Sequence, residues 1–483
     1  MKIVLALAPV WDSVTPPLTL AYMKSSISEA GYACKAIDLS TQFRSLMVSA
    51  LGDLAAEDYI ENHPELYQNW AEQICKENPD VVGFTILISN IKNTAIVAKE
   101  IKRRNPEILI VSGGPSLTLG DKHHIEHAYT FSDHIIEGEG EKAFVDFLKG
   151  YEQGEDLKKL KQLWIKEPDN SIYYTGTAPL QDIDSIPLPD FNDFDRKSYI
   201  FPDRLPILFS RGCILNCNYC TNKWNHLTQR SRSGQLVFEE LKRNVLEYGI
   251  KEYMFNDDSL ISYKTFNELE KFCDLAISED LILPWSVYGT RIERKLTEDY
   301  IRKLRRSGMM QVSLGVESFS TRVQKEMGKS SKEDDCDRVC RMFADQGIKT
   351  ETWIIYGYPT ETDEDFEVTL NWFKNNPNVL SHATINAFGP NQKYFEDRPN
   401  VVHYYPPYKL WHWKGLESTV EKRKERFLKL IEVVEEIRLS HKGFSYFMGD
   451  PLYVKYFNSW NEQDKRFLFD SWAKLESSYS LAG

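Results

Sequence analysis

Apolar and polar residues follow two alternating patterns along the first 150 residues. Short apolar runs predict strands at 3–9, 33–40, 81–87, 108–114 and 133–141. Between them, apolar residues recur every three or four positions, which predicts amphipathic helices at 18–31, 94–104 and 141–151. Strands and helices in regular succession are typical of a parallel sheet covered by helices on both faces. We therefore expect residues 1–150 to form a doubly wound, Rossmann-like α/β domain.

The same alternation returns in the second half of the chain. Residues 151–200 are rich in proline and aspartate, and they are interpreted as a linker. Six more strands are predicted, at 207–210, 251–259, 285–291, 309–318, 350–359 and 383–390. Helical patterns lie between them, at 238–249, 265–277, 297–308, 336–347 and 365–376. These βα units predict a partial (β/α)6 barrel over residues 201–392, with its site at the carboxyl ends of the strands.

Residues 393–483 do not continue this alternation. They contain a long predicted helix at 421–440 and many aromatic residues, among them Tyr404, Tyr405, Tyr408, Trp411 and Trp413. We expect a mainly helical, aromatic-rich C-terminal domain. Aromatic stripes usually serve packing, but this one could also cap the barrel and line a substrate cleft.

The composition excludes several classes of function. The chain has 483 residues, of which 42% are hydrophobic and 27% charged, as is ordinary for a folded soluble protein. Its net charge of −12 argues against nucleic-acid binding, which depends on a basic surface. Short basic clusters at 230–232 and 422–424 are expected on solvated faces. No apolar run approaches the ~20 residues of a membrane span, so we expect a cytoplasmic protein whose thiols stay reduced.

Three of the eight cysteines stand close together, at Cys213, Cys217 and Cys220. A structural zinc site needs four ligands, and only His226 is at hand to complete a Cys3His set. A thiol–disulfide motif needs two cysteines, which would leave one of these three unused. A [4Fe–4S] cluster takes four thiolates, so three would leave one iron open to bind something else. The remaining five cysteines, Cys34, Cys75, Cys273, Cys336 and Cys340, are expected to pack in the interior.

The spacing Cys-x3-Cys-x2-Cys, with an aromatic Tyr219 before the third cysteine, resembles the signature of the radical S-adenosylmethionine (SAM) superfamily. The resemblance covers about residues 205–390. It implies that the three thiolates hold a [4Fe–4S] cluster whose open iron is chelated by SAM. One electron from the cluster then splits SAM into methionine and a 5′-deoxyadenosyl radical.

The resemblance also implies which residues contact SAM at the strand ends. Asn256, Asp257 and Asp258 would bind its amino group, although Phe-Asn-Asp-Asp stands here in place of the family's Gly-Gly-Glu. Arg291 would pair with the carboxylate of SAM, since its planar fork suits that group. Glu317 would accept hydrogen bonds from the ribose. The implied SAM site is completed by Tyr219 and Tyr356.

An α/β domain ahead of such a barrel resembles the cobalamin-binding subclass of the superfamily, the class B methyltransferases. The implied cobalamin contacts lie in the loops after the strands: Trp11, Ser89, Asn90, Gly113, Gly114, Pro115, Ser116, Glu137 and Gly138. The Asp-x-His-x-x-Gly loop that supplies a histidine to cobalt in other cobalamin proteins is missing. We therefore expect Trp11, rather than a histidine of this loop, to shield that face of cobalt. A dinucleotide site at Gly138-x-Gly140-x-x-Ala143 is rejected, because the interleaved carboxylates would repel a pyrophosphate.

These observations predict a cobalamin-dependent radical SAM enzyme that methylates an unactivated carbon of a peptide or natural product. Non-methylating radical chemistry, namely cyclisation, rearrangement, oxidation or epimerisation, is the alternative, with or without cobalamin. An iron–sulfur sensor or scaffold is the non-enzymatic alternative. The expected partners are a small-molecule or peptide substrate and an electron donor such as flavodoxin or ferredoxin, with no nucleic acid and no membrane. The sequence leaves the oligomeric state open.

Overall fold

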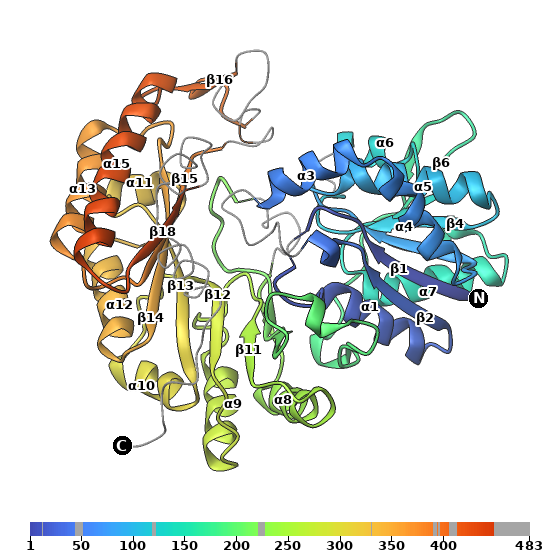
Figure 1. The fold of residues 1–483 in the computed structure, drawn as a ribbon, viewed down its shortest axis with the longest axis horizontal. Coiled ribbons are helices and arrows are strands. Elements are labelled where there is room, and N and C mark those ends of the chain that lie inside the picture. The colour runs from blue at the N-terminus through green and yellow to red at the C-terminus, as the bar shows by residue number, and fades with distance from the viewer. Residues whose placement is uncertain are drawn as a thin grey trace. The chain divides into compact units, whose positions relative to one another are not determined.

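The chain folds into two compact units, Met1–Pro206 and Ile207–Gly483, in the computed structural model shown in Figure 1. The structure describes residues 1–11, 13–43, 52–117, 122–220, 228–329, 331–389, 394, 397–404 and 413–448. For residues 52–55, 403–404 and 448 it describes the backbone alone. Each unit has its own seven-stranded sheet. No helix of the described residues is long and apolar enough to cross a membrane.

The sheet of the first unit has the strand order β2-β1-β3-β4-β5-β6-β7. Its parallel part comprises β1 (Lys2–Leu7), β2 (Ala33–Asp38), β3 (Val81–Thr85), β4 (Leu109–Gly113) and β5 (His134–Ile136). The order reverses direction between β1 and β3, which is the mark of a doubly wound sheet and the usual place for its ligand. The predicted architecture of this unit is confirmed.

Helices cover both faces of this sheet (Figure 1). One face carries α1 (Leu18–Glu29) and α7 (Gly140–Glu152). The other carries α3 (Gly52–Asn62), α4 (Glu65–Cys75), α5 (Ile91–Arg104) and α6 (Lys122–Ala128). Helix α4 was not predicted, yet it buries Tyr67, Trp70, Ala71 and Ile74 at helical spacing. These side chains join one core with Val4 and Ala6 of β1.

Residues 151–200 differ from the linker interpretation. They supply β6 (Leu163–Lys166) and β7 (Ile172–Tyr174), which extend the sheet from β5 in antiparallel fashion. Further along, the Asp193 carboxylate accepts a hydrogen bond from the Ala36 backbone at 2.8 Å and forms an ion pair of 2.8 Å with Lys24. The segment is therefore part of the first unit. Its polar residues form hydrogen bonds and ion pairs with distant parts of that unit, and a local sequence pattern does not show such contacts.

The second sheet has the order β18-β15-β14-β13-β12-β11-β8. Its first strands along the chain are β8 (Arg204–Ile207), β11 (Glu252–Phe255), β12 (Trp285–Arg291) and β13 (Met309–Glu317). Then follow β14 (Lys349–Tyr356), β15 (His382–Ala387) and β18 (Ser445–Met448). The pairings from β11 to β18 are all parallel. The partial barrel is confirmed, and β18 adds a seventh strand that the sequence did not predict.

Helices cover the outer face of this curved sheet (Figure 1). In chain order they are α8 (Gly234–Tyr248), α9 (Phe266–Ser278), α10 (Glu298–Arg306), α11 (Thr321–Glu326), α12 (Glu333–Asp345), α13 (Asp363–Asn375) and α15 (Val420–Ser440). The long α15 confirms a helix in the C-terminal region. Of the aromatic residues noted there, Tyr405, Tyr408 and Trp411 lie outside the described residues, and Trp413 is fully buried in β17 (Trp413–Gly415).

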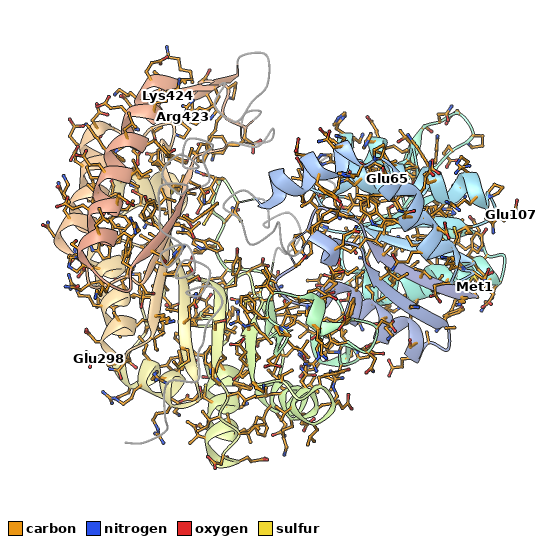
Figure 2. All side chains as sticks on the ribbon, in the orientation of Figure 1. Met1, Glu65, Glu107, Glu298, Arg423 and Lys424 are labelled. Atoms are coloured by element: carbon orange, nitrogen blue, oxygen red, sulfur yellow. The ribbon has the colours of Figure 1, made fainter. Side chains whose placement is uncertain are left out.

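Two arginines of the basic clusters are buried, although those clusters were expected on solvated faces. Arg423 and Lys424 are neighbours on α15 (Figure 2), but only Lys424 is exposed. The Arg423 guanidinium donates to the Trp413 carbonyl at 2.7 Å and lies 3.8 Å from the centre of that indole ring. Burial lowers the pKa of Arg423 to about 10. Arg232 is likewise buried and pairs with Glu240 at 2.6 Å, so the solvated-face prediction is wrong for both.

Candidate functional site

The cysteine loop begins at β9 (Ser210–Arg211), and two carboxylates from the end of β11 hold its first residues. Asp257 accepts hydrogen bonds from the Ser210 hydroxyl at 2.6 Å, from the Ser210 backbone, and from the Phe209 backbone at 3.2 Å. Burial raises the pKa of Asp257 to about 7, against the effect of these donors. Asp258 accepts from the Gly212 backbone at 3.3 Å. Asp257 therefore fixes the position of the first residues of the loop. Asn256, next to it, is exposed.

A turn after α11 supports the other side of the loop. The Asn218 backbone donates to the Met327 carbonyl at 3.0 Å, and the Tyr358 hydroxyl donates to the Asn218 side chain at 3.1 Å. Gly328 has φ +80° and lies so close that a Cβ there would be 3.0 Å from the Asn216 carbonyl. Only glycine combines that backbone conformation with so close a contact. The loop that carries the three thiols is therefore clamped between β11 and this turn.

Cys213, Cys217 and Cys220 form no disulfide. Burial raises the pKa of Cys217 to about 11, Lys329 opposes the shift, and the other two thiols are near enough to contribute to it. Within the described ranges, no three His, Cys, Asp or Glu side chains converge on a single metal ion. Thiolates are the ligands that hold iron–sulfur clusters, so the chemistry of these three cysteines suits a cluster. His226, the ligand needed for the zinc alternative, lies outside the described residues.

A buried ion pair stands beside the cysteine loop. The Lys329 ammonium lies 3.1 Å from a Glu317 carboxylate oxygen and donates to the Gly315 carbonyl at 2.5 Å. Burial lowers the pKa of Lys329, but the charges of Glu317 and Cys217 outweigh burial and raise it. Burial also raises the pKa of Tyr219, and Glu317 adds to that shift. The structure thus brings together Tyr219, Glu317, Lys329 and Cys217.

Glu317 ends β13 in a strained backbone conformation. Its φ of +67° is unusual for a residue with a side chain, and the register with β14 shifts between Gly315 and Glu317. Such strain costs about 1–3 kcal/mol and is typically kept at functional positions. Sequence reasoning found Glu317 but missed Lys329, because the turn that carries Lys329 has no recognisable pattern.

Two more of the residues predicted to contact SAM, Arg291 and Tyr356, differ in how they stand to this group. Arg291 ends β12 in register with Gly315, and its guanidinium already donates to Glu293 at 2.7 Å. Its buried Nε has no hydrogen-bond partner among the described residues, so it retains donor capacity. Tyr356 is on the helix-covered side of β14, where it is buried. It is near enough to Arg423 to influence the pKa of that guanidinium. The structure does not bring Tyr356 to Glu317.

Two aromatic rings form an open wall on the inner face of the sheet. The Trp353 indole lies within 4.0 Å of the Cβ position of Gly289, two strands away, so it extends across β13 at Gly315. The Tyr288 ring meets it edge to face, with centroids 5.4 Å apart, and is 47% exposed. Gly315 also borders the Glu317 carboxylate and the Lys329 ammonium. The wall is therefore continuous with the ion pair.

In the first unit, the predicted cobalamin residues follow β1 and β3 at the switch point of the sheet. The Ser89 hydroxyl donates to the Val10 carbonyl at 2.9 Å and so joins the two loops. Trp11, next to Val10, is partly exposed. Asn90 is fully buried, and its amide bonds the Leu87 backbone at 2.9 Å and the Thr85 carbonyl at 3.0 Å. Asn90 thus shapes its own loop.

The remaining cobalamin candidates follow β4 and β5. Gly113 is the last residue of β4, and the turn continues through Gly114, Pro115 and Ser116. A Cβ on Gly114, with φ +114°, would lie 2.7 Å from the Ile86 backbone. Glu137 is buried and accepts from the Trp164 indole at 2.7 Å, and a Cβ on Gly138 would lie 2.7 Å from Gln162. Gly114 thus lets two backbone segments approach closely, and Gly138 leaves room for the Gln162 side chain. Glu137 already accepts a hydrogen bond from Trp164 of the added strand β6.

The structure predicts that the Asp257 carboxylate is required for loop position. In Asp257→Asn an amide nitrogen must face at least one of three donors, which leaves a buried N–H unsatisfied at a cost of about 1–3 kcal/mol. We expect a lower thermal midpoint and less iron retained after anaerobic reconstitution. Asp258→Asn is the matched control, because its amide oxygen can still accept from Gly212. Equal losses in the two variants would contradict this role.

Comparison with protein families agrees with this geometry. Residues 207–373 match the Radical SAM superfamily, and residues 5–148 match the B12 binding domain. The chain therefore combines a B12-binding domain with a radical SAM domain, the domain pair of cobalamin-dependent radical SAM enzymes. The resemblance first seen at the cysteine loop is confirmed.

Individual relatives match this protein over most of its length. The uncharacterized methyltransferase PH0819 of Pyrococcus horikoshii is 29% identical over 392 residues, which are 77% of this chain and 78% of that protein. The anaerobic magnesium-protoporphyrin IX monomethyl ester cyclase of Rubrivivax gelatinosus is 27% identical over 382 residues. That match covers 76% of this chain and 64% of the relative.

A solved structure shows the same fold. The radical SAM methyltransferase TsrM of Kitasatospora setae, with tryptophan substrate and a SAM analog bound, aligns with a TM-score of 0.68 at 14% identity. The alignment covers 94% of this chain and 90% of that chain. The architecture of two α/β units and a helical C-terminal region is thus shared.

Proposed function

We propose that the protein is a cobalamin-dependent radical SAM enzyme that methylates an unactivated carbon. The observation that carries the proposal is the convergence of three cysteine thiols with the buried Glu317–Lys329 pair at the strand ends of a radical SAM domain. When bound, a [4Fe–4S] cluster would supply the electron that cleaves SAM, and cobalamin would carry the methyl group. Cys213, Cys217 and Cys220 would hold the cluster.

The residues around the loop have separate roles in this proposal. Asp257 and the Gly328 turn fix where the thiols stand. Lys329 fixes the Glu317 carboxylate on the inner face, where it can accept from the ribose hydroxyls of SAM. The buried ammonium also balances thiolate charge beside Cys217 in a region of low dielectric constant. Arg291 offers its free Nε to the SAM carboxylate.

The first unit offers a site suited to cobalamin at its switch point. Gly113, Gly114 and Gly138 lie at the carboxyl ends of the parallel strands, where backbone can approach a large ligand. The described residues of the loop after β1 include no histidine, and Trp11 stands there instead. Electron paramagnetic resonance of the Co(II) form should therefore lack the nitrogen splitting of a histidine ligand from this loop.

The inner-face wall favours a substrate that carries an aromatic or conjugated ring. Trp353 and Tyr288 offer a ring face and a ring edge beside the ion pair, and aromatic rings associate in both geometries. The similar TsrM structure has tryptophan bound as substrate, and a similar cyclase is named for magnesium-protoporphyrin IX monomethyl ester. Such a ring, in a natural product or a peptide side chain, is the substrate class that we propose.

The products of SAM distinguish methylation from its alternatives. Anaerobic protein reconstituted with iron, sulfide and cobalamin is incubated with SAM and dithionite, and both nucleoside products are measured. We expect 5′-deoxyadenosine from radical formation and S-adenosylhomocysteine from methyl transfer. If 5′-deoxyadenosine alone appears, methylation is refuted in favour of rearrangement, cyclisation, oxidation or epimerisation. If neither appears, a sensor or scaffold is the better account.

A further inference from the structure

A basic pocket opens beside the end of β12, outside the group formed by the cysteine loop and the ion pair. It encloses about 620 Å³, and its lining comprises Tyr263, Arg291, Glu293, Arg294, Lys295, Asp335 and Arg338. Lys264 adjoins it, with its ammonium 5.7 Å from the centre of the Tyr263 ring. Five cations thus face two carboxylates in a chain whose net charge is −12.

The two carboxylates of the pocket are already engaged. Glu293 is almost fully buried and pairs with Arg291 at 2.7 Å, while its other oxygen accepts from the Lys295 backbone at 3.0 Å. Asp335 lies 3.1 Å from Arg294 and also accepts from the Lys332 backbone. Each carboxylate is thus paired with an arginine. The remaining cationic side chains give the pocket a net positive charge.

The outer cations of the pocket are free to meet a partner. Lys264 and Lys295 are exposed and flank the half-exposed Tyr263 ring, with the Lys295 ammonium 5.1 Å from its centre. Arg338 lies deeper, where it donates to the Arg294 and Leu296 carbonyls at 2.9 and 3.3 Å and fixes the shape of the loop. The loops after β11 and β12 thus present an exposed aromatic ring between two lysines. Such a positive surface is suited to an acidic protein partner, because complementary charge steers the encounter of two proteins.

The pocket is also connected to the cysteine loop through adjacent structure. Arg291 is in register with Gly315 on the neighbouring strand, whose carbonyl accepts from Lys329. Lys329 in turn acts electrostatically on Cys217. Parallel strands lie ~4.8 Å apart, so the Arg291 backbone is one strand away from the residue whose carbonyl accepts from Lys329. A carrier docked here would meet the end of β12, the strand next to the one that ends at Glu317.

We propose that Lys264, Arg294 and Lys295 form the docking surface for an acidic one-electron carrier protein, such as a flavodoxin. The inference rests on the proposed function, in which the iron–sulfur centre must be reduced before SAM is cleaved. The reduced carrier loses one electron to that centre. The electron then breaks the carbon–sulfur bond of SAM, which gives methionine and the 5′-deoxyadenosyl radical. Opposite charges steer such an encounter and set its dependence on salt.

Charge reversal at the two exposed lysines tests this surface. The reconstituted wild type is compared with Lys264→Glu/Lys295→Glu and with the control Lys424→Glu/Lys429→Glu, which changes the net charge equally on α15. Formation of 5′-deoxyadenosine is driven either by dithionite or by flavodoxin kept reduced with NADPH and its reductase. Dithionite is a small reductant that needs no protein docking surface.

We expect the flavodoxin-driven rate at limiting flavodoxin to fall at least about tenfold in the pocket variant only. Its dithionite-driven rate should match that of the wild type. The Kd for flavodoxin, measured by calorimetry, should rise in parallel, and moderate salt should weaken wild-type binding. Unchanged affinity and rate in the pocket variant, or equal losses in the control, would overturn the docking surface. Absence of dithionite-driven cleavage in the wild type would refute the proposed function instead, while the binding measurement would still decide whether flavodoxin docks here.

Discussion

Replacing Cys213, Cys217 and Cys220 by alanine is expected to abolish iron incorporation and to lower SAM cleavage at least about 1,000-fold. Metal binding requires deprotonated ligands held in place by the fold, and alanine removes every thiolate of the loop. A radical cannot form without the reduced centre, so the loss should be close to complete. Iron and acid-labile sulfide per chain, with 5′-deoxyadenosine formation, measure the effect.

The control for this variant is Cys340→Ala. Cys340 is buried on α12, and burial raises the pKa of its thiol well above the ordinary value, as expected for an inert packing residue. Its replacement should cost some stability but leave the iron content unchanged. Iron retention by the triple variant, or equal iron loss in the control, would show that the loop does not hold the metal.

Replacing Lys329 by methionine is expected to have the second largest effect. The substitution leaves the Glu317 carboxylate buried without its cation, and breaking a buried pair in this way costs about 3–5 kcal/mol. We expect a clearly lower thermal midpoint and a loss of SAM cleavage of about 100-fold, since an unpaired Glu317 no longer holds its strained position. Calorimetry and 5′-deoxyadenosine formation measure the two effects.

Two further variants separate charge burial from function. Lys325→Met removes an exposed lysine from α11 and should change neither quantity. Lys329→Met/Glu317→Gln removes both buried charges, so it should recover stability relative to Lys329→Met while SAM cleavage stays low. If the double variant regains activity along with stability, the pair has only a structural role. If Lys329→Met is as stable and active as the wild type, the assignment of the pair is wrong.

The sequence could predict features that depend on local pattern. The cysteine spacing is contained in eight residues, and the strand that ends at Glu317 alternates apolar with polar or small residues, so both were located correctly. The alternation of strands and helices was sufficient to predict the parallel strands of the first sheet and all but β18 of the second. Asn256, Asp257 and Arg291 were correctly placed at strand ends for the same reason.

Features that depend on contacts between distant segments could not be predicted in this way. Lys329 reaches Glu317 because the turn after α11 packs against the cysteine loop. Arg423 is buried where Trp413 packs over it. Tyr356 stands at a strand end, but the side-chain alternation of β14 turns it toward the helices. Residues 151–200 have a linker-like composition. Trp164 and Asp193 of this segment nevertheless form hydrogen bonds with Glu137 and Ala36, so the segment is part of the first unit.

The central claim is that an iron–sulfur centre with one open position, held by three thiolates, binds SAM directly. Electron–nuclear double resonance on the reduced, reconstituted protein tests this with SAM labelled with nitrogen-15 at its amino group. Direct chelation predicts a nitrogen-15 coupling to the cluster that vanishes when unlabelled SAM replaces the labelled compound. A reduced centre that shows no such coupling at saturating SAM would contradict the claim.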